Sequence, residues 1–198
     1  MYYPILINEY GMPELQPLSL SLVDNHIGVC LVAITRDNYL LIWEQHKQTV
    51  IYPEFLVSSA SGSVDWGDLD KKNKSLLKTI ENAMKRELVE ENEMNSPPEI
   101  CIKVIGFYRQ LSRCGKPEFI GITRIRNMDR SDISPLEGIE PSNDLSFELY
   151  VPTIDQLILS VKNALESPKL SPSLSGTFYC LYEYLTGQKS QAEKLLYK

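Results

Sequence analysis

Residues 86–94 read RELVEENEM, and the loop before them, residues 62–68, reads GSVDWGD. The nine-residue stretch closes a longer segment, 75–94, whose apolar residues recur at the spacing of an amphipathic helix. Ser75 is placed to cap the start of this helix, because a serine side chain there accepts a hydrogen bond from a first-turn N–H. The sequence therefore predicts a loop and a helix over 62–94 as the unit that decides the fold.

Two glutamates lie where the helix should be apolar. At about 100° per residue, Glu87 and Glu91 fall one turn apart within a stripe whose other members are Leu76, Leu77, Ile80, Ala83, Met84, Leu88 and Met94. Two desolvated carboxylates repel each other, and a divalent cation with oxygen ligands is the simplest compensation. Glu90 can join from the edge, and Arg86 can pair with it across one turn. The alternative is that this end of the helix overhangs the core and faces water.

These residues resemble the Nudix box. The stretch 86–94 matches its second half, R-E-U-x-E-E-x-G-U with U apolar, and 62–68 is similar to its first half, G-x5-E. Three departures stand out. Asp68 replaces the first-half glutamate, Glu93 replaces the glycine, and seventeen residues separate Asp68 from Arg86 where the family has seven. The insertion of ten is assigned to the Lys-rich loop 69–78.

The resemblance implies an α/β fold, a Nudix-type α/β/α sandwich with a mixed sheet and an extra C-terminal helix. We expect a single Nudix domain over 1–198, with an N-terminal extension at 1–26, a core at 27–152 and C-terminal helices at 153–198. The pattern of apolar runs and turn residues predicts the following elements. They are a hairpin of 26–35 with 39–45, strands at 101–111, 118–126 and 147–151, a polar loop at 127–144, and helices at 153–166 and 173–186.

The resemblance also implies a function. Nudix enzymes use Mg²⁺ or Mn²⁺ to cleave the pyrophosphate bond of a nucleoside diphosphate linked to another moiety, such as a nucleotide sugar. The alternative is a non-catalytic Nudix-like module that binds a nucleotide as a sensor or regulator, which the stretched box and Glu93 favour. The retained box glutamates favour the enzyme.

Site residues follow by position in the box. The metal ligands implied are Gly62, through its carbonyl, with Glu87, Glu90 and Glu91. The catalytic residues implied are Glu90 and Glu91, with Arg86 orienting a glutamate. The general base is either a box glutamate or an acid of the 127–144 loop, where Glu137 and Glu140 are the candidates.

Substrate contacts are expected from three residues outside the acidic cluster. Trp66 lies within the box loop and could stack on a base or sugar, although packing on its own fold is equally compatible with the sequence. Arg109 and Arg124 lie on predicted strands and could reach phosphates, although alternating arginines on a strand also suit a solvated face. The sequence does not decide between these alternatives.

The composition of the chain limits the classes of binding partner that we expect. With 20 Lys and Arg against 26 Asp and Glu, the net charge of −6 disfavours coating of nucleic acid. The longest apolar run is far shorter than the roughly 20 residues that span a bilayer, so no membrane partner is expected. The four cysteines form no C-x-x-C pair, which favours a reduced, cytoplasmic location. We expect a small nucleoside diphosphate derivative as the partner and, by analogy with the family, a homodimer.

Overall fold

The computed structural model describes residues 5–7, 9–11, 13–15, 17–18, 26–49, 52–113, 115–136, 139–141, 147 and 149–198. A four-stranded sheet lies at its centre, in the order β6 (Ala60–Ser63), β3 (Gly28–Ile34), β9 (Lys116–Arg124) and β8 (Lys103–Gln110). β3 runs parallel to β9, and the other two pairs are antiparallel. The sheet is therefore mixed, as predicted, and β6 is an edge strand.

The described residues also form three smaller sheets. One has the order β11 (Ile139–Pro141), β4 (Trp43–Gln45) and β5 (Leu56–Val57). The others pair β10 (Ile133–Pro135) with β7 (Asn92–Met94), and β1 (Ile5–Ile7) with β2 (Pro13–Leu15). The loop predicted at 127–144 thus contains two short strands within its described residues.

The predicted hairpin of 26–35 with 39–45 is only partly correct. The chain does reverse at Asn38, which has a positive φ of 71°, and the Leu41 N–H donates to the Ala33 carbonyl. Beyond this turn the second segment leaves for the flanking sheet as β4, while β3 pairs with β6 and β9. Both edges of β3 pair with strands farther along the chain, and β3 is buried along its whole length, as is typical of a central strand.

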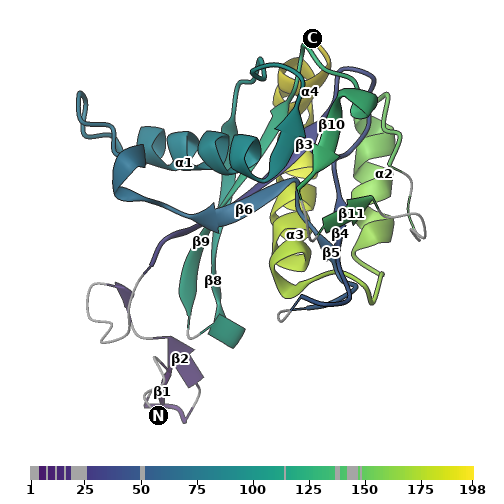
Figure 1. The fold of residues 1–198 in the computed structure, drawn as a ribbon. Coiled ribbons are helices and arrows are strands. Elements are labelled where there is room, and N and C mark those ends of the chain that lie inside the picture. The colour runs from purple at the N-terminus through teal and green to yellow at the C-terminus, as the bar shows by residue number, and fades with distance from the viewer. Residues whose placement is uncertain are drawn as a thin grey trace.

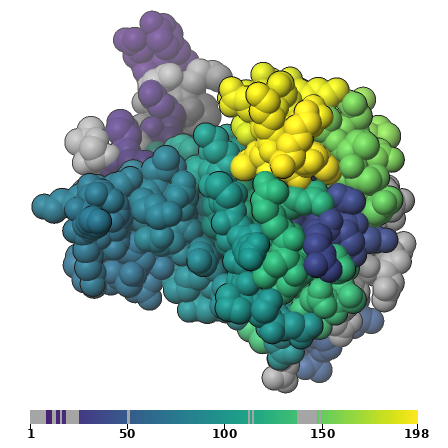
Figure 2. Space-filling model, turned by 90° about the horizontal axis from the view of Figure 1, so that it is seen from above, coloured from purple at the N-terminus to yellow at the C-terminus, as the bar shows by residue number. Residues whose placement is uncertain are grey.

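Helices cover both faces of the central sheet (Figure 1). α1 (Leu76–Glu90) lies on one face, where the Met84 side chain closes over Gly121 of β9. α3 (Pro172–Gly187) lies on the other face, with α2 (Ile154–Ala164) and α4 (Lys189–Tyr197) packed against it. The space-filling view shows α2 and α4 forming a continuous green and yellow surface, away from the blue surface around α1 (Figure 2). This is the predicted α/β/α sandwich, and α4 is a helix that the sequence did not predict.

Two apolar clusters correspond to the two faces. One joins Ile80, Ala83, Met84 and Leu88 of α1 to alternate residues of β3, and the other is filled by α2, α3 and α4. Leu76 and Leu77, which the helical stripe placed in the core, are 58% and 55% exposed. The first turn of α1 therefore extends beyond the sheet.

Helix α1 begins as predicted and ends early. The Ser75 hydroxyl caps its start by accepting from the Lys78 N–H, at 3.2 Å. Its end is at Glu90, not Met94, because Asn92 turns the chain into strand β7. The buried Asn92 amide donates to the carbonyls of Leu88 and Ser59, both at 2.9 Å, and so closes the helix from within the core.

The predicted C-terminal helices at 153–166 and 173–186 are confirmed as α2 and α3. The strand predicted at 147–151 is reduced, among its described residues, to one bridge between Tyr150 and Tyr39. Residues 1–26 are described only in part, so the division of the chain at 26 and 152 stays a prediction.

Candidate functional site

The acidic helix meets the sheet at the edge strand β6. A Cβ atom at Gly62 would overlap the Glu87 carboxylate, so only glycine lets that carboxylate reach the strand backbone. The Glu87 side chain is 12% exposed and the Glu90 side chain 57%. Gly62 and Glu87, two of the predicted metal ligands, therefore lie in contact, and their role as ligands stays a prediction.

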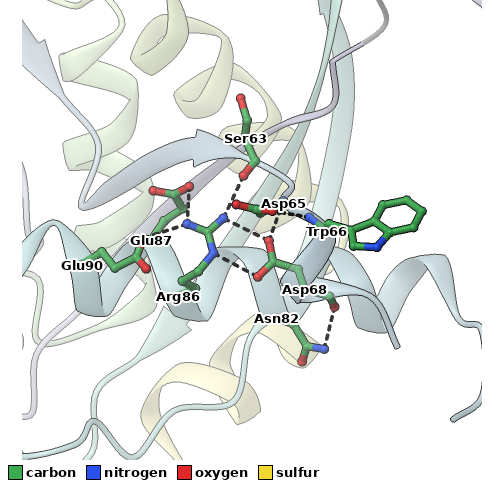
Figure 3. A network of polar contacts seen from close by, with 8 residues as sticks. All are labelled: Ser63, Asp65, Trp66, Asp68, Asn82, Arg86, Glu87 and Glu90. Atoms are coloured by element: carbon green, nitrogen blue, oxygen red, sulfur yellow. Dashed lines mark hydrogen bonds and ion pairs between the residues drawn. The ribbon is translucent and has the colours of Figure 1, made fainter. Parts of the chain in front are cut away.

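Arg86 organises the acidic groups around it (Figure 3). Its Nη1 donates to Glu87 Oε1 at 2.9 Å and to Glu90 Oε2 at 2.7 Å. Its Nε and Nη2 donate to the two oxygens of Asp68, each at 3.0 Å, and Nη2 also donates to the Ser63 carbonyl at 2.8 Å. These carboxylates, above all Asp68, raise the pKa of Arg86, so its charge is permanent.

Asp68 belongs to a short 3-10 helix, η2 (Trp66–Asp68), that orients it toward Arg86. Its Oδ2 also accepts from the Asp65 N–H at 2.8 Å, and its carbonyl accepts from the Asn82 side chain at 3.0 Å. Burial acts to raise the pKa of Asp68, but the bonds from Arg86 and Asp65 outweigh it and lower that pKa. Asp68 therefore stands ionised in the place of the usual box glutamate.

Glu91 follows the last residue of α1 and points back to β6. Its Oε2 accepts from the Ser61 N–H at 2.7 Å. Burial raises the pKa of Glu91 to about 7, the Ser61 bond opposes this, and repulsion from Glu87 and Glu90 adds to it. The site thus carries negative charge that its own residues leave incompletely compensated.

The donor atoms of this site are of the kind that a hard divalent cation prefers. Glu87, Glu90, Glu91 and the Gly62 carbonyl supply only oxygen, the donor that Mg²⁺ and Mn²⁺ prefer. Within the described part of the chain, however, no three His, Cys, Asp or Glu side chains are gathered closely enough to hold an ion. Arg86 Nη1 lies between Glu87 and Glu90 instead, and donates to one oxygen of each.

The three expected substrate contacts lie in different places. The Trp66 side chain is 80% exposed and points away from Arg86 and the carboxylates. Arg109 lies near the β8–β9 turn, and its Nε donates to the Gly115 carbonyl at 2.9 Å. Neither residue touches the acidic cluster, and both roles stay predictions.

The structure does not bring Arg124 to the box. Arg124 pairs with Ile34 at the far end of β9, six residue pairs from Glu118, or about 20 Å along the strand. Its guanidinium is used there, because it donates to the carbonyls of Leu196 and Arg36 and to the Asn38 side chain. Of the two candidate bases outside the box, Glu137 lies outside the described residues and only the backbone of Glu140, in β11, is described.

Two cavities, of about 190 and 300 Å³, lie beside β6 and the start of α3, and Ser61 and Ser173 line both. The smaller one is lined by Gly62 itself together with Lys116 and Glu118 of β9, and both are lined by Arg113. Sequence reasoning singled out none of these three charged residues. The available signal was Glu118, a carboxylate close before the apolar residues Phe119, Ile120 and Ile122 of a predicted strand.

Comparison with known proteins supports the fold. No family model and no curated protein matches the chain. Among solved structures, it is similar to a Nudix hydrolase from Alicyclobacillus acidocaldarius, with 12% identity, a TM-score of 0.51, and coverage of 89% of this chain and 98% of that one.

Two further solved structures give lower scores. A protein from Deinococcus radiodurans has 15% identity and a TM-score of 0.49, covering 91% of this chain and 99% of that one. A MutT protein from Methanosarcina mazei has 13% identity and a TM-score of 0.48, covering 82% and 96%.

The likeness to the Alicyclobacillus structure shows that this chain has the Nudix fold, as its box-like motif predicted. In the part of the chain that the structure describes, no helix is long and apolar enough to cross a bilayer.

Proposed function

We propose that this protein is a Nudix-family, divalent-metal-dependent hydrolase that cleaves the pyrophosphate bond of a nucleoside diphosphate linked to another moiety. The observation that carries the proposal is the placement of Glu87 against Gly62 of β6, with Arg86 joining Glu87, Glu90 and Asp68. The box-like sequence, split by its insertion, is thus reassembled in space on a Nudix fold.

Glu87, Glu90, Glu91 and the Gly62 carbonyl would hold Mg²⁺ or Mn²⁺. When bound, the cation neutralises charge on the pyrophosphate and makes water a better nucleophile. Arg86 holds one oxygen each of Glu87 and Glu90, which leaves their second oxygens for other partners. It is a positioning residue in this account, because its donors are directed at protein groups.

The box itself offers a group to accept a proton. Glu91 has one oxygen on the Ser61 N–H and a second that this bond does not use. Glu90 is the more exposed carboxylate and has one oxygen on Arg86. We assign the base to this pair of box glutamates, which needs no acid from the 127–144 loop.

The experiment is turnover of a panel of nucleotide sugars, dinucleotides and nucleoside triphosphates with Mg²⁺ or Mn²⁺, with identification of the products. The expected result is a nucleoside monophosphate from at least one compound, lost on adding a chelator. Calorimetry of Mg²⁺ binding gives a second readout, which should weaken in Glu87→Gln. Absence of turnover on every compound would sink the proposal.

One observation favours the alternative, a binding module without catalysis. Arg86 Nη1 already lies between Glu87 and Glu90, and the described acidic side chains are not gathered into an ion site. A binder of this kind would hold a nucleotide equally well with and without Mg²⁺. Calorimetry in both conditions, followed by recovery of intact ligand, separates this reading from the hydrolase.

A further inference from the structure

Two cavities beside β6 lie next to each other and share part of their lining. Ser61, Arg113 and Ser173 line both of them, and the smaller cavity also reaches Gly62 and Ser63 of the edge strand. The smaller cavity thus adjoins Gly62, which the Glu87 carboxylate contacts, and the larger one, of about 300 Å³, is near the lower end of the range for small-molecule sites.

A buried ion pair lies in the wall of the smaller cavity. The Glu118 side chain is 4% exposed, and its Oε1 accepts from Lys116 Nζ at 3.0 Å. Its carboxylate lies against the backbone of Gly28, where a Cβ atom would overlap it. Lys116, whose side chain is 11% exposed, compensates the buried charge, so this pair is neutral as a unit.

Arg113 adds a cation that this pair does not require. Its Nη1 is 4.0 Å from Glu118 Oε1, beyond hydrogen-bond distance, and its side chain is 53% exposed. With Glu118 balanced by Lys116, the charge at the shared wall of the two cavities is that of Arg113, plus one. A guanidinium has five N–H donors in a planar fork, which suits a carboxylate or a phosphate.

Most residues that line the larger cavity carry polar side chains, although Val57 also lines it. Serines from β6, α3 and the segment between β5 and β6 line it, and the one aromatic ring among its described lining residues, Tyr52, lies against Phe55 with ring centroids 5.8 Å apart. Hydroxyl groups suit a sugar-like moiety better than a base, which needs an aromatic face to stack on. The cavity therefore favours a hydroxylated group over a nucleobase.

We propose that Arg113 determines specificity by binding an anionic group, carboxylate or phosphate, on the sugar-like moiety that leaves with the second phosphate. The substrate class is then a nucleoside diphosphate linked to an acidic sugar or a sugar phosphate. This inference rests on the proposed hydrolase function. It adds a requirement for an anionic group on the sugar-like moiety, which the box residues do not impose.

The experiment compares matched substrates that differ only in this group. UDP-glucose and UDP-glucuronate test a carboxylate, and ADP-ribose and its derivative phosphorylated on the distal ribose test a phosphate. With Mg²⁺, kcat/KM should be at least about tenfold higher for the anionic member of one pair, as expected for a charge-assisted contact. The pair that shows the preference identifies which anion is used.

Arg113→Gln should reduce the ratio of kcat/KM between the anionic and neutral substrates to within about twofold of unity. The control is Lys162→Gln, an equal change of charge at an exposed position of α2, which should leave this ratio unchanged. Because Arg113 is half exposed, the variant should keep the thermal midpoint of the parent protein. A ratio near one in the parent, or a ratio that survives Arg113→Gln, overturns the inference while the hydrolase function stands.

If no compound is turned over, the hydrolase proposal fails by itself. Binding of the same four compounds, measured by calorimetry, then tests the Arg113 subsite separately. Tighter binding of an anionic member that is lost in Arg113→Gln supports the subsite, and equal binding of both members of each pair overturns it.

Discussion

Arg86 and Asp68 form a bidentate ion pair, with Nε on Oδ1 and Nη2 on Oδ2, each at 3.0 Å. The pair joins helix α1 to the loop that begins at Gly62, across an insertion of ten residues relative to the Nudix box. Asp68 is one methylene shorter than the box glutamate, and the fork still closes because η2 holds Asp68 buried and facing the helix. The two halves of the split box-like sequence therefore meet in space.

Asp68→Asn should destabilise the protein by about 2 kcal/mol, because an amide carries no charge and offers only one oxygen where the buried carboxylate accepts two bonds from Arg86. Urea unfolding measures this loss. Asp155→Asn is the matched control, since the Asp155 side chain is 74% exposed in its pair with Lys189 and should change stability by less than about 1 kcal/mol. Equal effects of the two variants would contradict the role given to Asp68.

Gly62→Ala should weaken Mg²⁺ binding, because the added Cβ would displace the Glu87 carboxylate from β6. Calorimetry should show at least about a tenfold loss of affinity. Gly67→Ala, in the same loop but with open space around it, is the control and should bind Mg²⁺ as the parent does. Unchanged affinity in Gly62→Ala would show that the Gly62–Glu87 approach does not matter for the ion.

Asn92→Ala should cost about 2 to 3 kcal/mol of unfolding free energy. The Asn92 side chain donates to two carbonyls and accepts from the Trp43 indole N–H at 3.0 Å, so its loss leaves three buried groups without that partner. Chemical unfolding followed by tryptophan fluorescence measures the change. Asn163→Ala, at an exposed position of α2, should stay within about 0.5 kcal/mol, and a similar value for Asn92→Ala would exclude this role.

Much of this architecture could be predicted from the sequence because it depends on local patterns. The cap at Ser75 and the apolar spacing of α1 are local, and the box-like spacing placed Gly62 with the helix glutamates. The end of α1 could not be predicted, because Asn92 closes the helix through Ser59, a residue far from it in the chain. Helical periodicity alone extended the helix to Met94.

The cavity residues could not be predicted for a related reason. Arg113 and Lys116 flank a turn and read as ordinary surface charges until β3 and β9 pair in parallel and bring Glu118 beside Gly28. Arg124 shows the opposite case. Its strand was predicted, but register decides which end of the sheet it occupies, and that end is away from the box.

Cys30 should resist thiol reagents in the folded protein at pH 8. Burial raises the pKa of its thiol to about 11, and its Sγ lies 3.1 Å from the Ser58 hydroxyl, whereas Cys101 is exposed. Labelling followed by peptide mass spectrometry should find Cys101 modified first and Cys30 only after unfolding. Modification of both at equal rates in native protein would contradict the burial of Cys30.

The same thiol gives a pH dependence with a defined sign. The unfolded thiol ionises near its ordinary pKa of 9.0 and the folded one near 11, so the folded state holds its proton longer. Its contribution is therefore constant below about pH 9, and stability falls as pH rises from there toward 11. In Cys30→Ala this fall should be smaller than in the parent, and an identical fall would contradict the assignment.

The central claim is that the box glutamates act with a divalent cation on a pyrophosphate. The most direct measurement is Mg²⁺-dependent turnover of the best panel compound by Glu91→Gln and Glu93→Gln, which make the same change two residues apart. Glu93 is exposed on β7 and stands where the box has glycine, so its variant should turn over at the parent rate. Glu91→Gln should lose at least about a hundredfold in kcat. Undiminished turnover by Glu91→Gln would contradict the account.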